Sequence, residues 1–128
     1  MSELIQALRN NPCFYAEQGA SAIQIEQAEK ALGLEFASDF KECLREFGAF
    51  SFRSHELTGF SSDQSLDVVE ATQKNRQKHG VPENLYVIEE AHVDGIVVWQ
   101  NANGTVYETS LRSGTKKIAN SLAEYLLA

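Results

Sequence analysis

The sequence predicts an α+β fold in one domain, residues 1–128, with a mainly antiparallel sheet of about four to six strands flanked by N-terminal, middle and C-terminal helices. Segments with a 3.6-residue apolar repeat occur near the start, in the middle and at the end of the sequence. Three short β-branched segments in the third quarter are separated by turns too short for crossover helices, so their strands must be antiparallel. The 128 residues, 43% of them hydrophobic, suffice for one core but hardly for two.

The first two helices are indicated by their ends. Residues 2–8 carry a short apolar stripe, and a proline soon follows. Residues 21–33 give a stronger pattern, because Ser21 and Gln24 fit a capping box. Gly33 suits the left-handed position that closes a helix.

A further helix is expected over residues 38–48. Phe40, Cys43, Leu44 and Phe47 fall on one face at helical spacing, and a glycine ends the segment. The opposite face is charged and is expected to be solvated. Cys43 is therefore predicted to be a small core residue.

The middle of the chain predicts strands and then a helix. Residues 50–60 alternate loosely between apolar and polar side chains, which indicates one or two short strands broken near Gly59. Residues 65–80 are expected to be helical, with Ser65 as the cap and Asp67 in the first turn.

The last third predicts three strands and a terminal helix. The strands are expected at residues 85–89, 96–100 and 105–109, and an Asn-Gly turn favours a hairpin between the last two. Residues 117–127 place apolar side chains, Ile118 among them, on one helical face.

Charge and hydropathy exclude several classes of protein. A formal net charge of -7 opposes the phosphate neutralisation that nucleic-acid binding needs, so a nucleic-acid partner is not expected. The first residues lack the basic and apolar regions of a signal peptide, and no stretch reaches the roughly 20 apolar residues of a membrane span. We therefore expect a cytoplasmic protein whose charge favours encounter with a basic surface.

Chemistry-bearing motifs are absent from the sequence. It has no nucleophile elbow, phosphate-binding loop or paired metal-binding histidines, and His55, His79 and His92 are isolated. Cys13 and Cys43 are expected to be reduced. We predict no catalytic residues, no metal and no cofactor, although a small enzyme assembled from distant positions stays an alternative.

Acidic residues suggest a partner-binding surface. One run lies in residues 54–73, which hold no Lys or Arg, and a second lies in residues 89–94. If the runs meet, they form a negative patch; otherwise both are ordinary solvated surface. The candidate partner-binding residues are Glu56, Asp63, Asp67, Glu70, Glu90 and Asp94, with Trp99 either an interface anchor or a core residue.

Part of the pattern resembles the SUKH superfamily, which includes the yeast cell-wall assembly regulator and many bacterial immunity proteins. The N-terminal signature is matched by Ile25, Glu29, Leu32, Gly33, Leu34, Phe36, Asp39, Phe40, Leu44, Phe47, Gly48 and Phe52. Later matches are Leu57-Thr58-Gly59, Thr72 with Arg76, Val81-Pro82 with residues 85–88, Val106-Tyr107 and residues 121–126. The chain departs from the family at Ala37, where proline is common, and at Phe47-Gly48, where Asn-Gly is common.

The resemblance implies an immunity protein that binds and neutralises a bacterial toxin domain, often a nuclease. The expected partner is a cationic toxin domain encoded beside this gene. The alternative is an intracellular regulatory or scaffold module that binds several host proteins, as the yeast branch suggests. The sequence predicts no oligomeric state.

Overall fold

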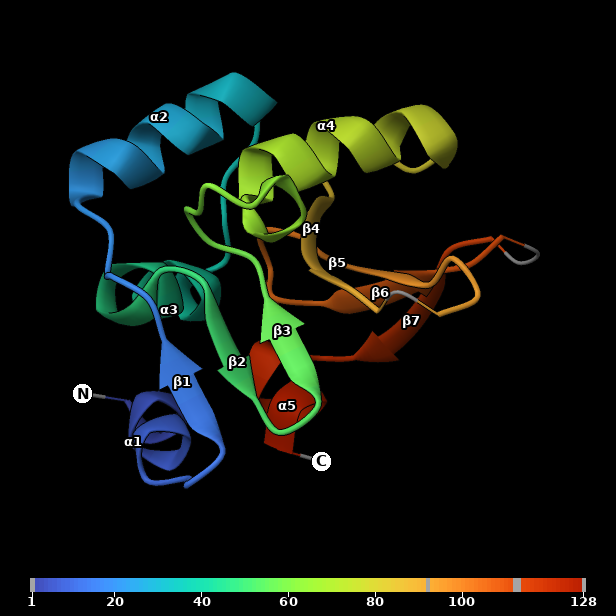
Figure 1. The fold of residues 1–128 in the computed structure, drawn as a ribbon. Helices are drawn as coiled ribbons and strands as arrows, with labels where there is room; N and C mark the ends of the chain where they lie inside the picture. Colours follow the sequence, from blue (N-terminus) through green and yellow to red (C-terminus); the bar gives the residue numbers. More distant parts are fainter. Residues whose placement is uncertain (1, 92, 112–113, 128) are drawn as a thin grey trace.

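The computed structural model describes residues 2–91, 93–111 and 114–127 (Figure 1). The helices in these ranges are α1 (Glu3–Arg9), α2 (Ala22–Leu32), α3 (Ser38–Phe47), the short 3-10 helix η1 (Gln64–Leu66), α4 (Val68–Lys78) and α5 (Leu122–Leu127). The strands are β1 (Phe14–Ala16), β2 (Phe50–Phe52), β3 (His55–Leu57), β4 (Tyr86–Glu90), β5 (Val97–Gln100), β6 (Val106–Thr109) and β7 (Lys116–Ala119). The α+β class is confirmed.

The strands form one antiparallel sheet in the order β1-β2-β3-β4-β5-β6-β7. Over the described ranges the sheet has seven strands, so the expected four to six was too few. β1 was missed because three residues are too short to show a two-residue period. The break after β2 lies at the 53–54 turn, where Arg53 has φ 57°, and not near Gly59.

The expected C-terminal helix over residues 117–127 is wrong in its first part. That part forms β7, which pairs with β6, and the helix α5 begins only at Leu122. Ile118 is 37% exposed on β7 and does not face a helix interface. An apolar residue at this position fits the 3.6-residue repeat of a helix and the two-residue repeat of a strand. The segment forms a strand because its backbone groups pair with those of β6.

The expected helix over residues 65–80 begins later than its pattern indicated. Asp67 caps α4, because its carboxylate accepts a hydrogen bond from the Glu70 N–H at 3.1 Å. Ser65 is instead held by Asp63, whose Oδ1 accepts from the Ser65 N–H at 3.0 Å and so caps η1. Asp67 therefore precedes the first turn of α4 and does not lie in it.

Several local predictions are confirmed. Ser21 and Gln24 form both hydrogen bonds of the capping box on α2, and Gly33 closes that helix with φ 68°. Cys43 is buried on α3. β5 and β6 form the expected antiparallel hairpin.

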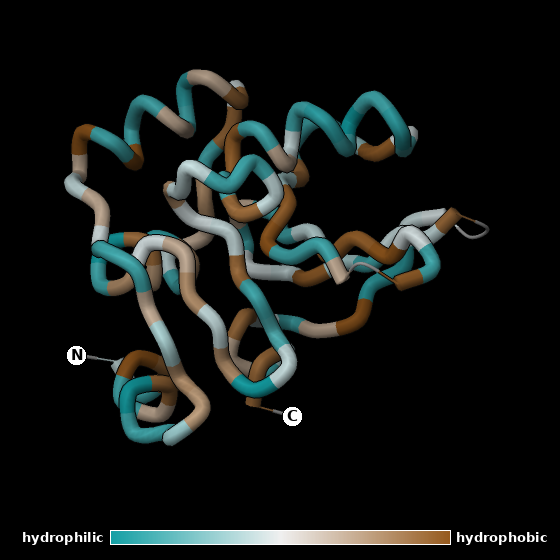
Figure 2. Tube along the Cα trace, viewed as in Figure 1, coloured by the Kyte–Doolittle hydropathy of each residue, from teal (hydrophilic) through white to brown (hydrophobic). Residues whose placement is uncertain are grey.

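The apolar interior forms two cores. Figure 2 marks the hydrophobic residues along the helices and strands. The main core lies between α1, α2, α3, α5 and one face of the sheet, and it includes the edge-to-face pair Phe36–Phe40. A smaller core under α4 joins Ala71 of that helix to Val87 and Trp99 on the other face of β4 and β5. These two strands are therefore covered on both sides, whereas β1, β3 and β7 each carry exposed residues.

Gly59 gives a stability prediction. A Cβ atom added there would lie 2.2 Å from Ala49 N and 2.3 Å from Gly48 C, both of them backbone atoms that cannot rotate away. We expect Gly59→Ala to lower the free energy of unfolding by about 3 kcal/mol or more. Gly80→Ala is the matched control, since its Cβ would meet nothing within 4 Å and should change stability by less than about 1 kcal/mol. Urea titrations of both variants measure the difference, and equal stabilities would contradict this packing.

Candidate functional site

The outer face of β1–β3 carries a row of side chains that do not belong to either core. Tyr15, Ser51 and Glu56 are register neighbours across the three strands, so their side chains point to the same side. The alternate residues Phe50, Phe52 and Leu57 point the other way and are buried. Tyr15 is 69% exposed, although it lies between two partly buried residues.

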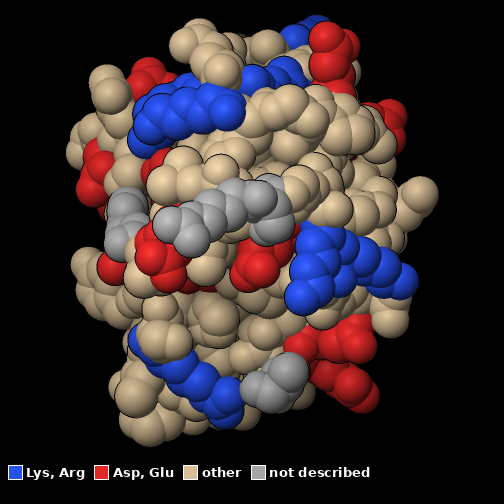
Figure 3. All heavy atoms as spheres, turned by 90° about the vertical axis from the view of Figure 1, so that its right-hand side faces the viewer, with Lys and Arg blue, Asp and Glu red and all other residues tan. Residues whose placement is uncertain are grey.

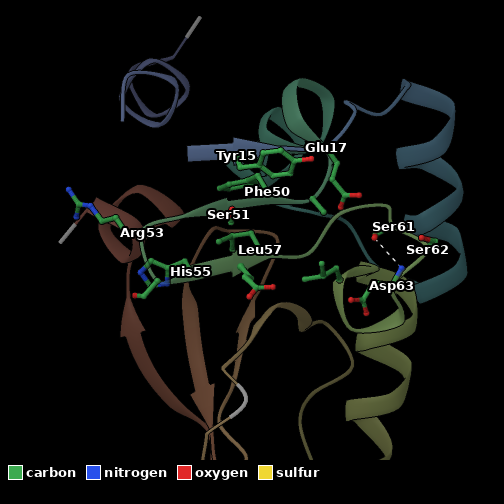
Figure 4. A pocket seen from close by; sticks show the side chains of 14 residues that line it. Tyr15, Glu17, Phe50, Ser51, Arg53, His55, Leu57, Ser61, Ser62 and Asp63 are labelled. Atoms are coloured by element: carbon green, nitrogen blue, oxygen red, sulfur yellow. Dashed lines mark hydrogen bonds between the residues drawn. The ribbon is translucent and has the colours of Figure 1, made fainter. Parts of the chain in front are cut away.

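This face is hollowed, with a cavity of about 660 Å³ that is open to solvent (Figure 4). The small Ser51 lies between the longer Tyr15 and Glu56, and the 61–63 loop forms a further wall. Polar and aromatic side chains line this cavity, which we call the β1–β3 hollow: Tyr15, Glu17, Ser51, Glu56, Ser61 and Asp63. Three of the six are carboxylates.

The cation at the edge of the hollow is directed away from it. Arg53 lies in the β2–β3 turn, and its guanidinium lies over the Phe52 ring, 4.9 Å from the ring centre. Figure 4 shows the Arg53 side chain pointing away from Tyr15 and Asp63. The carboxylates of the hollow therefore face solvent without neutralisation by this arginine.

A buried carboxylate supports the hollow from behind. Glu89 on β4 is 5% exposed, and its Oε2 accepts a hydrogen bond from the Glu56 N–H at 2.8 Å. Its Oε1 lies 2.9 Å from His55 Nδ1 and also accepts a hydrogen bond from the Tyr125 hydroxyl of α5. Glu89 thus connects β3, β4 and α5 through one side chain.

Tyr125 responds to this environment. Burial, followed by the hydrogen bond to Glu89 and the negative charges of Glu89 and Glu108, raises the pKa of the Tyr125 hydroxyl well above its usual range. The neutral hydroxyl is the form that can donate a hydrogen bond to Glu89. One of the hydrogen bonds that attach α5 to the sheet therefore depends on this proton.

The other candidate acids have different surroundings. Asp67 caps α4, and Glu70 is exposed one turn later. Glu90 receives a hydrogen bond from Asn75 at 2.9 Å and an ion pair from Lys74 at 3.1 Å, so its charge is largely compensated. Glu89 and Glu90 face opposite sides of β4, as their adjacency predicted.

Asp94 lies apart from the β1–β3 hollow. It lines a separate depression with Glu108 at the end of the sheet formed by the β4–β5 and β6–β7 connections. Acidic and basic side chains are interleaved on this side of the molecule (Figure 3). The two acidic runs therefore do not merge into one negative patch: Glu56 and Asp63 share the hollow, while Asp94 does not.

Trp99 is not available as an interface anchor. Its side chain is completely buried under α4, and its Nε1–H donates a hydrogen bond to Thr109 Oγ1 at 2.9 Å. The alternative assignment, a core residue, is the correct one. The exposed aromatic side chain on the acidic face is Tyr15, which sequence reasoning missed because its three-residue strand has no periodic signal.

Metal and catalytic chemistry have little support in the described ranges. No group of three or more His, Cys, Asp or Glu side chains there could hold a metal ion. His55 and Glu89 have the geometry of a base and its orienting carboxylate, but within residues 2–91, 93–111 and 114–127 no serine or cysteine hydrogen-bonds to the His55 ring. None of the helices in these ranges is both long and apolar enough to cross a membrane.

The residues of the family signature build the frame that carries this face. Thr58 Oγ1 donates to the Val87 carbonyl at 2.8 Å, and Thr72 Oγ1 accepts from the Val87 N–H at 2.9 Å. Arg76 donates to the Glu83 carbonyl at 2.6 Å. These side chains fix the path of β4 against β3 and α4.

The chain belongs to the SUKH superfamily, because a model of one of its families matches it. More narrowly, the family model SUKH_5, described as SMI1-KNR4 cell-wall, matches residues 1–128, so the chain belongs to that family over its whole length. The resemblance expected from the sequence is confirmed. No curated protein matches the chain.

Tyr125 gives a pH prediction. Because its folded-state pKa lies above the ordinary value of about 10, its contribution to stability is present below pH 10 and is lost as the pH rises above it. Burial also raises the pKa of Tyr86 and Cys43, so the protein should lose stability steeply in alkali. Tyr125→Phe should cost about 1–2 kcal/mol at pH 7 and lose less stability than the parent between pH 9 and about 11.

Urea titrations at each pH measure this difference. Tyr15→Phe is the matched control, because it removes a hydroxyl that solvent already reaches. An alkaline loss in Tyr125→Phe as large as the loss in the parent would contradict the assigned role of the Tyr125 proton.

Proposed function

We propose that this protein is an immunity protein that binds and neutralises a cognate bacterial toxin domain with a basic surface, such as a nuclease. The observation that carries the proposal is the β1–β3 hollow, which combines three carboxylates with an exposed aromatic side chain. Membership of the SUKH superfamily supports it, because that superfamily includes immunity proteins. Inhibition then needs only tight binding over the toxin's active site, with no chemistry by this chain.

The charge of the protein supports the same partner. A net charge of -7 attracts a cationic domain from a distance, which raises the rate of association. Buried contacts at the hollow then determine how long the complex lasts, since affinity depends mainly on the dissociation rate. A toxin that binds nucleic-acid phosphates has a positive surface, which complements the negative charge of this protein.

A regulatory protein-binding module is the second candidate. The description of the matched family model mentions the cell wall, which favours a housekeeping role with several host partners. The same hollow serves either role, so the partner and not the fold separates them. A large modular toxin gene beside this one favours immunity, and a housekeeping operon favours regulation.

Immunity predicts binding and rescue. Co-expression of this protein with the adjacent gene product should restore growth to cells that the product kills, and the two proteins should co-purify. A double charge reversal in the hollow, Glu17→Lys with Glu56→Lys, should weaken both the growth rescue and the co-purification. Absence of both binding and rescue by the parent protein would overturn the immunity assignment.

Charge complementarity predicts a salt-dependent association rate. The variant Glu17→Lys/Glu56→Lys should associate with the partner roughly tenfold more slowly at low salt, and the difference should shrink at high salt. These positions are preferable to Asp63 and Asp67, which cap η1 and α4, so that their replacement also perturbs folding. The control for net charge alone is Glu26→Lys/Glu35→Lys, a double reversal of two exposed residues outside the hollow. Equal rates for both variants in stopped-flow measurements would remove the hollow from the interface.

A further inference from the structure

We propose that the β1–β3 hollow receives an arginine side chain of the protein partner, with its guanidinium stacked on Tyr15 and hydrogen-bonded to Glu17 and Glu56. This inference rests on the proposed function, because it names the group through which a basic partner docks. It also makes a narrower claim, since a protein could bind a toxin through another surface. Three properties of the hollow lead to it: its free aromatic face, its spacing and its fixed backbone.

The Tyr15 ring is largely uncovered by the described residues of the chain. Tyr15 is 69% exposed, while its strand neighbour Phe14 packs on the other side against Phe47, with ring centres 4.6 Å apart. Helices α1, α3 and α5 contribute to the main core on the Phe14 side, and α4 packs on the Tyr15 side over β4 and β5. The Tyr15 ring is therefore available to a side chain that comes from outside the molecule.

The spacing of the hollow suits one long planar cation. Neighbouring strands are about 4.8 Å apart, so Tyr15 on β1 and Glu56 on β3 are separated by about 10 Å across Ser51. The Glu17 N–H donates to the Ala49 carbonyl at 3.0 Å, which extends the pairing of β1 past its end and places Glu17 on the same side as Tyr15. The two carboxylates thus flank the ring above a short hydroxyl side chain.

The backbone of Glu56 is held before any partner arrives. Its N–H donates to the buried Glu89 carboxylate at 2.8 Å, and its strand pairs with β2 on the other side. Fixed elements lose less conformational entropy on binding than mobile ones do. The hollow is therefore a prearranged surface and not a loop that must order around its partner.

Arginine fits these groups better than lysine does. A guanidinium is planar, stacks on an aromatic ring and presents several N–H donors that two carboxylates can share. An ammonium is a strongly hydrated point charge that gains less from the ring. Charge complementarity demands a cation at this face, and the ring selects the planar one.

The test is a titration of the 15N-labelled protein with the peptide acetyl-Gly-Arg-Gly-amide, followed by amide chemical shifts. We expect saturable shifts centred on Tyr15, Ser51 and Glu56. The citrulline peptide, which has the same shape without the charge, should give none, and the lysine peptide should bind at least about threefold more weakly. Tyr15→Ala should weaken binding of the arginine peptide about three- to fivefold. Glu56→Gln should weaken it as well, whereas Glu26→Gln on α2 should leave it unchanged.

Four results would overturn the inference: no saturable shift, shifts centred on another face, equal binding of the lysine or citrulline peptide, or unchanged binding by Tyr15→Ala and Glu56→Gln. The growth-rescue assay separates this failure from failure of the proposed function. A parent protein that rescues cells but does not discriminate arginine keeps its function and loses this site. A parent protein that binds the arginine peptide but neither binds nor rescues against the toxin keeps the site and loses the immunity role.

Discussion

A buried chain of hydrogen bonds around Gln100 holds the helices on the sheet, and the rest of the fold depends on it. The Tyr86 hydroxyl donates to Gln100 Oε1 at 2.6 Å and accepts from the Ala37 N–H at 2.9 Å. Gln100 Nε2 donates to Asp39 Oδ1 at 3.0 Å, and Asp39 Oδ2 accepts from the Leu122 N–H at 3.0 Å. One connected network thus fixes the first turns of α3 and α5 on β4 and β5. Since unpaired polar groups are costly in such a site, the arrangement admits few alternatives.

The strands that carry the β1–β3 hollow are joined to β4 by few backbone pairs. β3 and β4 share a single register pair, Leu57 with Glu89, supplemented by the hydrogen bonds of Thr58 to β4. The Glu89 carboxylate supplies the remaining connection to β3 and adds α5 to it. The position of the hollow is therefore set by these polar contacts together with the apolar packing of Phe50, Phe52 and Leu57 in the main core. Its own shape is set by the pairing of β1 with β2 and of β2 with β3.

Local chemistry in the sequence was enough to predict many helices and strands but not the β1–β3 hollow. The capping box at Ser21 and the Asn-Gly hairpin are determined by neighbouring residues, so their patterns correspond directly to structure. Tyr15 lies in a strand that exists only because residues 50–52, far along the chain, pair with it. Trp99 has a sequence context that suits either the surface or the interior, and packing of α4 decides the outcome. Ile118 likewise fits two periods, and long-range pairing selects one.

The alternation of side chains along β1–β3 separates the residues that pack in the interior from the residues that face outward. Phe14, Phe52 and Leu57 hold the interior, while Tyr15 and Glu56, each beside one of them, face outward. Substitutions on the outward positions can change partner preference without disturbing the interior, because the pleat keeps the two sets on opposite sides. Under the proposed function, such a surface would let the chain accommodate a changed partner by exchanging a few alternate residues, at little risk to folding.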